Sequence, residues 1–263
     1  MIYNPHHLSR CLKPVTLAAA SCLFVFASCH SSYHLTGISG TRMLIDARYD
    51  AHPDAQAAAF IAPYAHTVDS LMKPVIGKSA RDMAARKPES TLSNLLSDIL
   101  LWGGDEFNEH PDFAVYNMGG IRASLPEGDI TYGDVLNVAP FENHICFLTL
   151  TGDKVLQLFA EMAARGGEGV SHGVNVVASS DGKLLKATLN GQPIDPAKRY
   201  RVVTLDYLAQ GNDGLTAFKD KTDIVSPQDE KYDVRNVIVG YFRHFAQQGK
   251  TVDAKVEGRF TIQ

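Results

Sequence analysis

The sequence predicts a mixed α/β domain of the α+β kind, with packed helices and a partly antiparallel sheet. Short apolar runs typical of strands alternate with longer segments in which apolar residues recur at helical spacing. Turns such as Asn190-Gly191 are of the type that joins adjacent antiparallel strands. No Gly-, Pro- or Ser-rich linker interrupts residues 41–263, so we expect one domain over that range.

Two elements are expected at the start of this domain. Residues 41–49 mix Met, Leu, Ile and Ala and predict a strand. Residues 53–72 predict a helix, because apolar residues recur at helical spacing on one face: Ala57, Phe60, Ile61, Tyr64, Val68 and Leu71. Pro63 should kink this helix or split it, since proline lacks the amide donor that a helix interior needs.

A second helix is expected to begin after Ser90, which is a good N-cap residue. Its apolar stripe consists of Leu92, Leu95, Leu96, Ile99 and Leu100. Asn94 and Asp98 lie one turn apart on the flank of this stripe. We expect them at the surface or as capping groups.

The remaining elements follow from the same two periodicities. Strands are expected at residues 113–116, 145–150, 174–178, 184–189, 200–205 and 259–262. A helical turn is expected to open at residues 130–134, and helices are expected at residues 154–164 and 234–247.

The N-terminus has the features of an export signal. Arg10 and Lys13 precede an apolar run at residues 15–26 that is too short to span a bilayer. The run ends in small residues before Cys29, an arrangement that resembles the lipobox of bacterial lipoproteins.

This resemblance implies a signal peptide at residues 1–28, acylation of Cys29 and a flexible tether at residues 29–40. An ordinary secretory signal, in which Cys29 has no role, is the alternative. A lipid-anchored chain would lie in the bacterial cell envelope and contact the membrane through its lipid. No acidic run follows Cys29, which favours the periplasmic face of the outer membrane.

Cysteine content and charge exclude several classes of protein. Of Cys11, Cys22, Cys29 and Cys146, only Cys146 follows the tether, so the domain has no internal disulfide and Cys146 is expected to be a small buried residue. The formal net charge is −4 and there is no basic run, which argues against a nucleic-acid polymer as partner. A compact anion is still allowed, because a few local arginines outweigh a weak distant field.

Three segments carry side chains suited to a ligand. Residues 117–122 place a glycine pair before an arginine, which permits a tight turn beside a planar cation. Residues 139–143 add an aromatic ring and an amide, and residues 206–214 add a second ring and a carboxylate. Each segment alone is typical of an ordinary turn or core anchor. Together they provide the groups that hold an aromatic base, a sugar and a phosphate.

The order and spacing of these segments resemble the C-terminal domain of the 5'-nucleotidase family. The shared patterns are Asn-x-Gly-Gly-Ile-Arg, Pro-Phe-x-Asn and Asp-Tyr-Leu-Ala-x-Gly-x-Asp-Gly. The helix after Glu89, the preceding Ile76-Gly77 and Arg86 add to the resemblance, which covers residues 69–263.

The resemblance implies roles for nine substrate-binding residues. Phe141 and Tyr207 would stack on the two faces of the base, Tyr207 replacing a phenylalanine often found in the family. Asn117 and Asn143 would hydrogen-bond the base or the sugar, and Asp213 would accept from the ribose hydroxyls. Arg86 and Arg122 would bind the phosphate. Gly120 and Gly173 would border the pocket.

The resemblance also implies what the chain does not supply. Enzymes of this family carry an N-terminal metallophosphatase domain that binds two metal ions and activates water. Asp50-Ala51-His52 matches the Asp-x-His pattern of one metal-binding motif of that domain. His144 lacks the preceding glycine and the following acidic residue that a second motif, Gly-Asn-His-Glu/Asp, requires. The other histidines after Cys29 lie at positions 30, 34, 66, 110, 172 and 244, without ligand spacing. We therefore expect no catalytic residue and no cofactor in this chain, with divalent metals only in a partner metallophosphatase chain.

Four functions remain open at this stage. The first is a nucleotide- or nucleoside-binding domain that presents substrate to a separate metallophosphatase, which would hydrolyse the phosphoester. The second is a non-enzymatic nucleoside- or nucleotide-binding lipoprotein. The third is hydrolysis by this chain alone through Asp50, His52 and other histidines, and the fourth is a scaffold without a ligand. The motifs do not define the base or the number of phosphates.

Overall fold

The computed structural model describes residues 33–263. The expected signal peptide and the acylation site Cys29 lie outside the described residues. The chain divides into two compact units, Met1–Asp54 and Ala55–Gln263, and the ligand-facing segments all lie in the second. The second unit lies within the range 41–263 over which one domain is expected. Within residues 33–263, no helix combines the length and the hydrophobicity that crossing a bilayer requires.

The first elements differ from the expectations in two respects. Residues 41–49 form no strand, because no described segment pairs with them; only a 3-10 helix η1 (Ala47–Tyr49) forms there. Pro63 does not split the following helix, which runs uninterrupted as α2 (Ala55–Met72). No residue of α2 is buried, so water can reach the carbonyl that Pro63 leaves without a donor.

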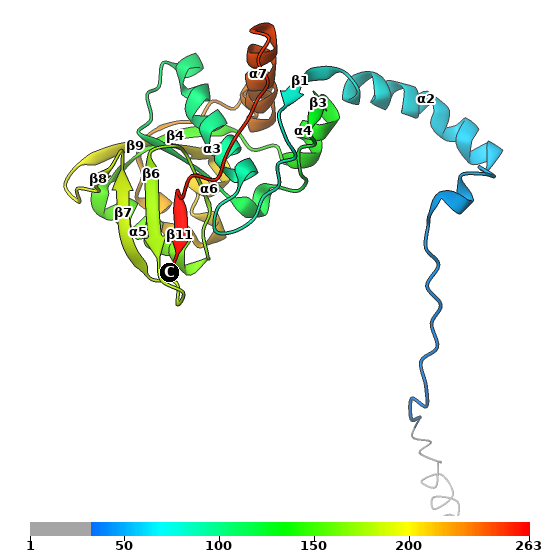
Figure 1. The fold of residues 1–263 in the computed structure, drawn as a ribbon, viewed down its shortest axis with the longest axis horizontal. Helices are drawn as coiled ribbons and strands as arrows, with labels where there is room; N and C mark the ends of the chain where they lie inside the picture. Colours follow the sequence, from blue (N-terminus) through cyan, green and yellow to red (C-terminus); the bar gives the residue numbers. More distant parts are fainter. Residues whose placement is uncertain (1–32) are drawn as a thin grey trace, which may run out of the picture. The chain divides into compact units, whose positions relative to one another are not determined.

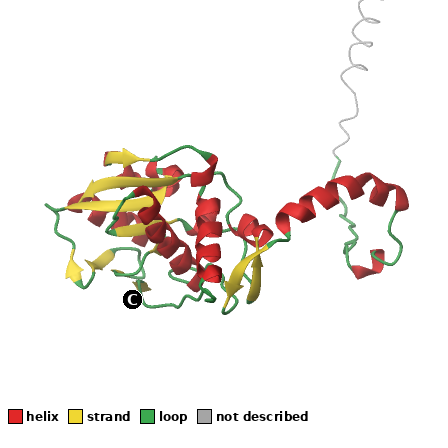
Figure 2. Ribbon diagram, turned by 90° about the horizontal axis from the view of Figure 1, so that it is seen from above, coloured by secondary structure: helices red, strands yellow, loops and turns green. Residues whose placement is uncertain are grey.

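A five-stranded mixed sheet forms the centre of the second unit (Figures 1 and 2). Its spatial order is β10 (Thr222–Val225), β4 (Ile145–Thr151), β9 (Arg199–Leu205), β2 (Phe113–Tyr116) and β5 (Gly169–Val170). β4 pairs antiparallel with β9, whereas β2 pairs parallel with β9. The carboxyl ends of β2 and β9 and the amino end of β4 therefore meet at one edge of the sheet.

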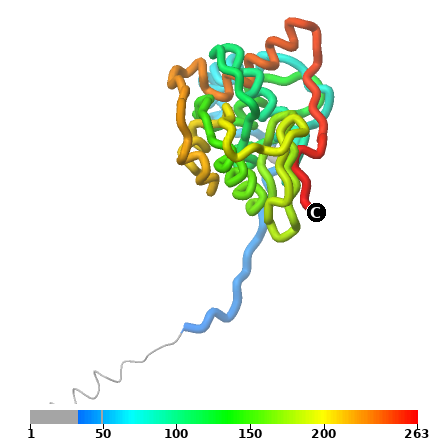
Figure 3. The backbone as a smooth tube through the Cα atoms, turned by 90° about the vertical axis from the view of Figure 1, so that its left-hand side faces the viewer, coloured from blue at the N-terminus to red at the C-terminus, as the bar shows by residue number. Residues whose placement is uncertain are grey.

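Two smaller sheets complete the strands. One is the antiparallel pair β1 (Val75–Ser79) and β3 (Gly128–Thr131). The other has the order β11 (Phe260–Ile262), β6 (Val174–Ala178), β7 (Leu184–Leu189) and β8 (Gln192–Pro193). Asn190 and Gly191 both have positive φ, as the predicted hairpin turn between β7 and β8 requires. The C-terminal segment, red in Figure 3, ends in β11, which pairs parallel with β6.

The helices pack on these sheets as the apolar patterns predict. α3 (Thr91–Gly103) covers β2 and β5, and α5 (Gly152–Ala164) contacts β4 and β9. The predicted stripe of α3 is fully buried, and Ser90 caps the helix through a capping box with Ser93. The other helices are α4 (Tyr132–Val138), α6 (Asp206–Ala209) and α7 (Val234–Gln247). Short 3-10 helices are η2 (Gly104–Phe107), η3 (Met118–Gly120), η4 (Asn212–Gly214), η5 (Thr216–Asp220) and η6 (Glu230–Tyr232).

The flank of α3 differs from the expectation. Asn94 is buried rather than at the surface, and its amide donates to Glu89 Oε1 at 2.6 Å and to the carbonyl of Lys255 at 2.9 Å. Asp98 binds Arg259 in a two-pronged ion pair. Both side chains therefore anchor the C-terminal segment, a contact between residues too far apart in sequence for a local pattern to predict.

Candidate functional site

The turn after β2 carries the first group of the site. Asn117 follows the last residue of this buried strand, and η3 then turns the chain sharply. The N–H of Met118 donates to Oε2 of the buried Glu168 at 2.6 Å, so a remote carboxylate caps the turn. The Asn117 side chain does not cap its own helix and is free for other contacts.

The second group lies in the loop between α4 and β4. Its Phe141 ring is 49% exposed, which is unusual for a phenylalanine in a well-packed fold. Asn143 is half-buried one residue before the β-bridge of His144 with Asp233. The backbone of Asn143 is fixed because its carbonyl accepts from the N–H of Val234 at 2.8 Å.

The third group follows β9. Tyr207 lies in the short helix α6, and its hydroxyl donates to Asp213 Oδ1 at 3.0 Å. This hydrogen bond raises the pKa of Tyr207 above its ordinary value, because deprotonation would place two negative charges side by side. Asp213 has a positive φ of 54°, a conformation that Asp tolerates better than most residues. The ring of Tyr207 and the carboxylate of Asp213 therefore form one unit.

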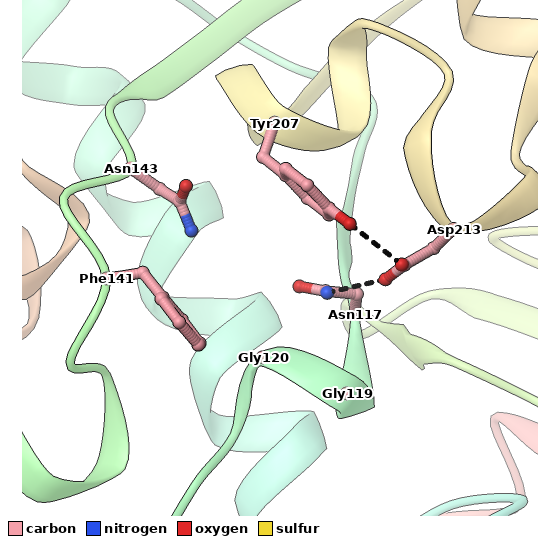
Figure 4. A pocket seen from close by; sticks show the side chains of 7 residues that line it. All are labelled: Asn117, Gly119, Gly120, Phe141, Asn143, Tyr207 and Asp213. Carbon is pink, nitrogen blue, oxygen red and sulfur yellow. Dashed lines mark hydrogen bonds between the residues drawn. The ribbon is translucent and has the colours of Figure 1, made fainter.

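These three groups enclose a single cavity (Figure 4). Its volume is about 240 Å³, and its lining consists of Asn117, Gly119, Gly120, Phe141, Asn143, Tyr207 and Asp213. Typical ligand pockets measure about 300–1,000 Å³, so this cavity suits one ring system with its immediate substituents rather than a large ligand. The sheet topology explains the assembly, because two segments leave β2 and β9 and the third enters β4 at the same edge.

The orientation of the Asn117 amide gives this cavity a definite polarity. Asn117 Nδ2 donates to Asp213 Oδ2 at 2.7 Å, which assigns the other end of the amide as the oxygen. Asn117 Oδ1 is buried and has no partner in the described part of the chain. Figure 4 shows this oxygen directed away from Asp213, toward the space between Phe141 and Tyr207. The cavity therefore presents a buried acceptor that lacks a donor.

Three of the nine predicted site residues lie outside this lining. The Arg122 side chain is exposed and folds back on the turn, with Nη1 3.4 Å from the Gly119 carbonyl. Arg86 lines a second cavity of about 640 Å³, beside the N-terminus of α3. Gly173 borders a third cavity and packs against the β7–β8 turn, where a methyl group on it would lie 2.3 Å from Asn190 Oδ1.

Sequence reasoning overlooked several groups that support the site. Gly119 lines the cavity, although the family resemblance points only to Gly120 of the pair. Glu168 accepts Lys87 Nζ at 3.0 Å and Arg165 Nε at 3.3 Å in addition to the Met118 amide. The run Gly-Gly-Glu-Gly around Glu168 is an ordinary loop pattern, so no local signal marks this carboxylate as buried.

Metal-binding groups do not gather near the cavity. Among residues 33–263, no three His, Cys, Asp or Glu side chains come together in a way that would hold a metal ion. Cys146 lies buried in β4, and burial raises the pKa of its thiol. It therefore has the character of a core residue rather than a nucleophile.

Comparison with known proteins identifies the family. The model of the 5'-nucleotidase C-terminal domain matches residues 75–220, which is more than half of the chain. The chain belongs to the 5'-nucleotidase C-terminal domain family. The matched range runs from β1 to η5 and contains every residue that lines the cavity.

Relatives and solved structures agree with this membership. The chain is 39% identical to Protein UshA of Escherichia coli (strain K12) over 119 residues, which cover 44% of this chain and 22% of that protein. It is 26% identical to a 5'-nucleotidase-related protein of Glossina morsitans morsitans, over 91% of this chain and 49% of that protein. The crystal structure of a 5'-nucleotidase precursor from Thermus thermophilus superimposes with a TM-score of 0.69 at 28% identity. That match covers 81% of this chain and 44% of the other.

The fold class is confirmed by these structural neighbours, while the coverage limits what they say of function. A structure of Haemophilus influenzae NAD nucleotidase has the same fold, with a TM-score of 0.59 at 21% identity. The chain spans less than half the length of each of these four proteins. Membership in the family is therefore established for the domain, whereas the activity of the longer proteins is not thereby transferred to this chain.

Proposed function

We propose that this chain is a nucleoside- or nucleotide-binding domain that presents its ligand to a separate metallophosphatase chain. In this proposal the base lies between the rings of Phe141 and Tyr207, and the sugar lies toward Asp213. Stacking on such rings is worth about 1–3 kcal/mol per base and tolerates every base.

The observation that carries the proposal is the unpaired acceptor between the two rings. A buried polar atom without a partner costs about 1–3 kcal/mol, so a ligand that donates to Asn117 Oδ1 would recover that cost. A nucleobase edge or a sugar hydroxyl offers such a donor attached to a flat ring system. A purely apolar ligand would satisfy the rings but not the amide.

The partner part of the proposal rests on the family. Arg122 and Arg86 are exposed cations, suited to a phosphate that must remain accessible to a second protein. The metal ions that activate water would belong to that protein, and this chain would bind and orient the substrate. We further propose that acylation of Cys29 holds the chain at the periplasmic face of the outer membrane.

Thermal-shift and calorimetric titration of the purified protein tests the proposal. The ligands are four nucleosides, their 5'-monophosphates and diphosphates, and sugar nucleotides. Stabilisation should grow as RT ln(1 + [L]/Kd), about 2.7 kcal/mol at roughly a hundred times Kd. Phe141→Ala should weaken binding about 5- to 150-fold, the equivalent of about 1–3 kcal/mol. Because the Phe141 ring is half exposed, its loss should change the melting temperature of the free protein little.

The outcomes separate the competing functions. Binding that Phe141→Ala abolishes supports the proposal, and a pull-down from native membranes that recovers a metallophosphatase supports the partner. Binding that is unaffected by any added metallophosphatase favours a non-enzymatic binding lipoprotein instead. No binding of any ligand favours a scaffold, and phosphate release that survives chelation and Asp50→Ala excludes hydrolysis at an Asp50–His52 metal site.

A further inference from the structure

The guanidinium of Arg235 holds the peptide groups that lead into the Phe141 ring. Arg235 is the second residue of α7 and is half-buried. Its Nε donates to the carbonyl of Ala139 at 3.1 Å, and its Nη2 donates to the carbonyls of Pro140 and Phe141 at 3.0 and 3.3 Å. One side chain therefore binds three consecutive carbonyls at the end of α4.

The rest of this loop gives Phe141 little support. In the described part of the chain, no backbone N–H donates to the carbonyls of residues 139–141. Pro140 has no N–H of its own, and only about half of the Phe141 surface is covered by neighbouring residues. By contrast, Asn143 and His144 are held by backbone bonds, because their carbonyls accept from the N–H groups of Val234 and Asp206 at 2.8 and 2.9 Å.

We propose that Arg235 is a positioning residue that fixes Phe141 as a stacking platform in the cavity. The planar fork of arginine matches adjacent carbonyls, and its charge complements the negative end of α4. An unsupported loop would have to be ordered when a ligand binds, which costs affinity; Arg235 removes this cost beforehand. The inference rests on the proposed function, because it concerns how the same cavity binds a ring.

The nature of the substitution distinguishes positioning from simple charge. Arg235→Lys keeps the positive charge but has one compact ammonium group in place of a fork. If Arg235 positions the loop, Arg235→Lys should lose most of the affinity that Arg235→Ala loses. If it only attracts an anionic ligand, the lysine variant should bind as the wild type does, and uncharged nucleosides should not respond to either change.

The experiment is a double-mutant cycle measured by calorimetry. The probe is whichever of adenosine, guanosine, cytidine and uridine binds the wild-type protein most tightly. Arg235→Ala should weaken its binding on the order of 10-fold, within the stacking contribution of one ring. In the Phe141→Ala background the same change should alter Kd by less than about twofold, since Arg235 acts through that ring. Hydrogen exchange of residues 139–143 should accelerate in Arg235→Ala without any ligand present.

Arg201→Ala is the matched control. Arg201 is a half-buried arginine at the opposite end of β9 from Tyr207, bound to Glu109 at 2.7 and 2.6 Å. It should lower the melting temperature but leave both Kd and the exchange of residues 139–143 unchanged. Equal effects of Arg235→Ala in the presence and absence of the Phe141 ring would overturn the assignment. So would wild-type affinity in Arg235→Lys.

Failure of this inference is distinguishable from failure of the proposed function. Wild-type binding that Phe141→Ala weakens but Arg235→Ala does not would overturn only the role of Arg235. Absence of nucleoside binding by the wild type would remove both. Should Arg235→Ala fail to fold, the lysine variant still decides the question, because it retains the charge beside Asp233.

Discussion

Asn117 is the residue on which the chemistry of the cavity depends most. One end of its amide is bound to Asp213 and the other is left as an acceptor inside the cavity. Asp213 also accepts the hydroxyl of Tyr207, so three side chains from two separate segments form one hydrogen-bonded chain. The acceptor therefore has its direction set before any ligand arrives.

This geometry makes Gly120 a sensitive position. A methyl group at Gly120 would lie 2.7 Å from Asn117 Oδ1, whereas one at Gly119 would meet only Asp213 Oδ2, at 3.9 Å. Gly120→Ala should therefore displace the acceptor and weaken nucleoside binding about 5- to 30-fold, the equivalent of a lost hydrogen bond of about 1–2 kcal/mol. Gly119→Ala should have a clearly smaller effect. Calorimetric titration of both variants tests this, and an equal loss in the two would contradict it.

At the scale of elements, the C-terminal strand β11 is fastened by a buried cation. Arg259 is 5% exposed and binds Asp98 on α3 and Glu257 beside β11. The carboxylate of Glu257 also accepts from His172 Nδ1, 3.0 Å away, when the imidazole carries its proton on that nitrogen. Hydrogen bonds from His172 and then Arg259 hold the pKa of Glu257 below its ordinary value.

The lowered pKa of Glu257 predicts that the stability of the protein depends on pH. Because its pKa is lower in the folded than in the unfolded protein, the unfolded chain binds more protons as pH falls. The stabilisation is complete above the ordinary pKa of a glutamate and is lost as pH falls through the lower folded value. Glu257→Gln should cost about 1 kcal/mol or less near neutral pH, since the carboxylate is partly exposed and screened by solvent.

Urea unfolding from pH 3 to 7 measures this difference. The gap between the wild type and Glu257→Gln should close at the acid end of the range. Glu127→Gln is the control, because the Glu127 side chain is exposed and makes no hydrogen bond or ion pair in the described structure beyond its backbone bond to Asp82. A gap for Glu257→Gln that stays constant with pH would show that the ion pair does not contribute.

At the scale of the whole molecule, the second unit contains everything that the candidate site needs. The cavity, its supporting groups and the core all lie within Ala55–Gln263. Residues 33–48 are exposed along their whole length. Of the described residues, those at 33–48 are therefore exposed, whereas the second unit holds the packed core.

A chain reduced to residues 55–263 should accordingly keep its stability and its ligand. We expect its melting temperature to lie within about 2 °C of that of the longer chain, since the described residues 33–48 are all exposed. Its affinity for nucleosides should be unchanged. Calorimetry on both proteins tests this, and a large fall in either quantity would contradict it.

The fold could be predicted from sequence where a local pattern is strong. The strands at 113–116, 174–178 and 184–189 and the helix at 234–247 agree with the structure residue for residue. The strands β1, β3 and β10 and the two-residue strands β5 and β8 were not predicted, because short or irregular strands carry little periodicity. Ile130 and Thr131, expected in a helical turn, belong to β3. The expected strand at 41–49 shows the converse error, since an apolar run forms a strand only where a partner exists.

The candidate site could likewise be predicted from sequence only in part. The family resemblance of three sequence segments pointed to six of the seven residues that line the cavity, whereas each segment alone is typical of an ordinary turn or core anchor. Only the tertiary structure decided that β2, β4 and β9 bring these segments to one edge of a sheet. It alone showed that Glu168 and Arg235 hold two of the segments, and that Arg86 and Gly173 border other cavities. Local patterns encode the elements and their exposed groups, whereas contacts between residues distant in sequence depend on the pairing of strands and the burial of charge.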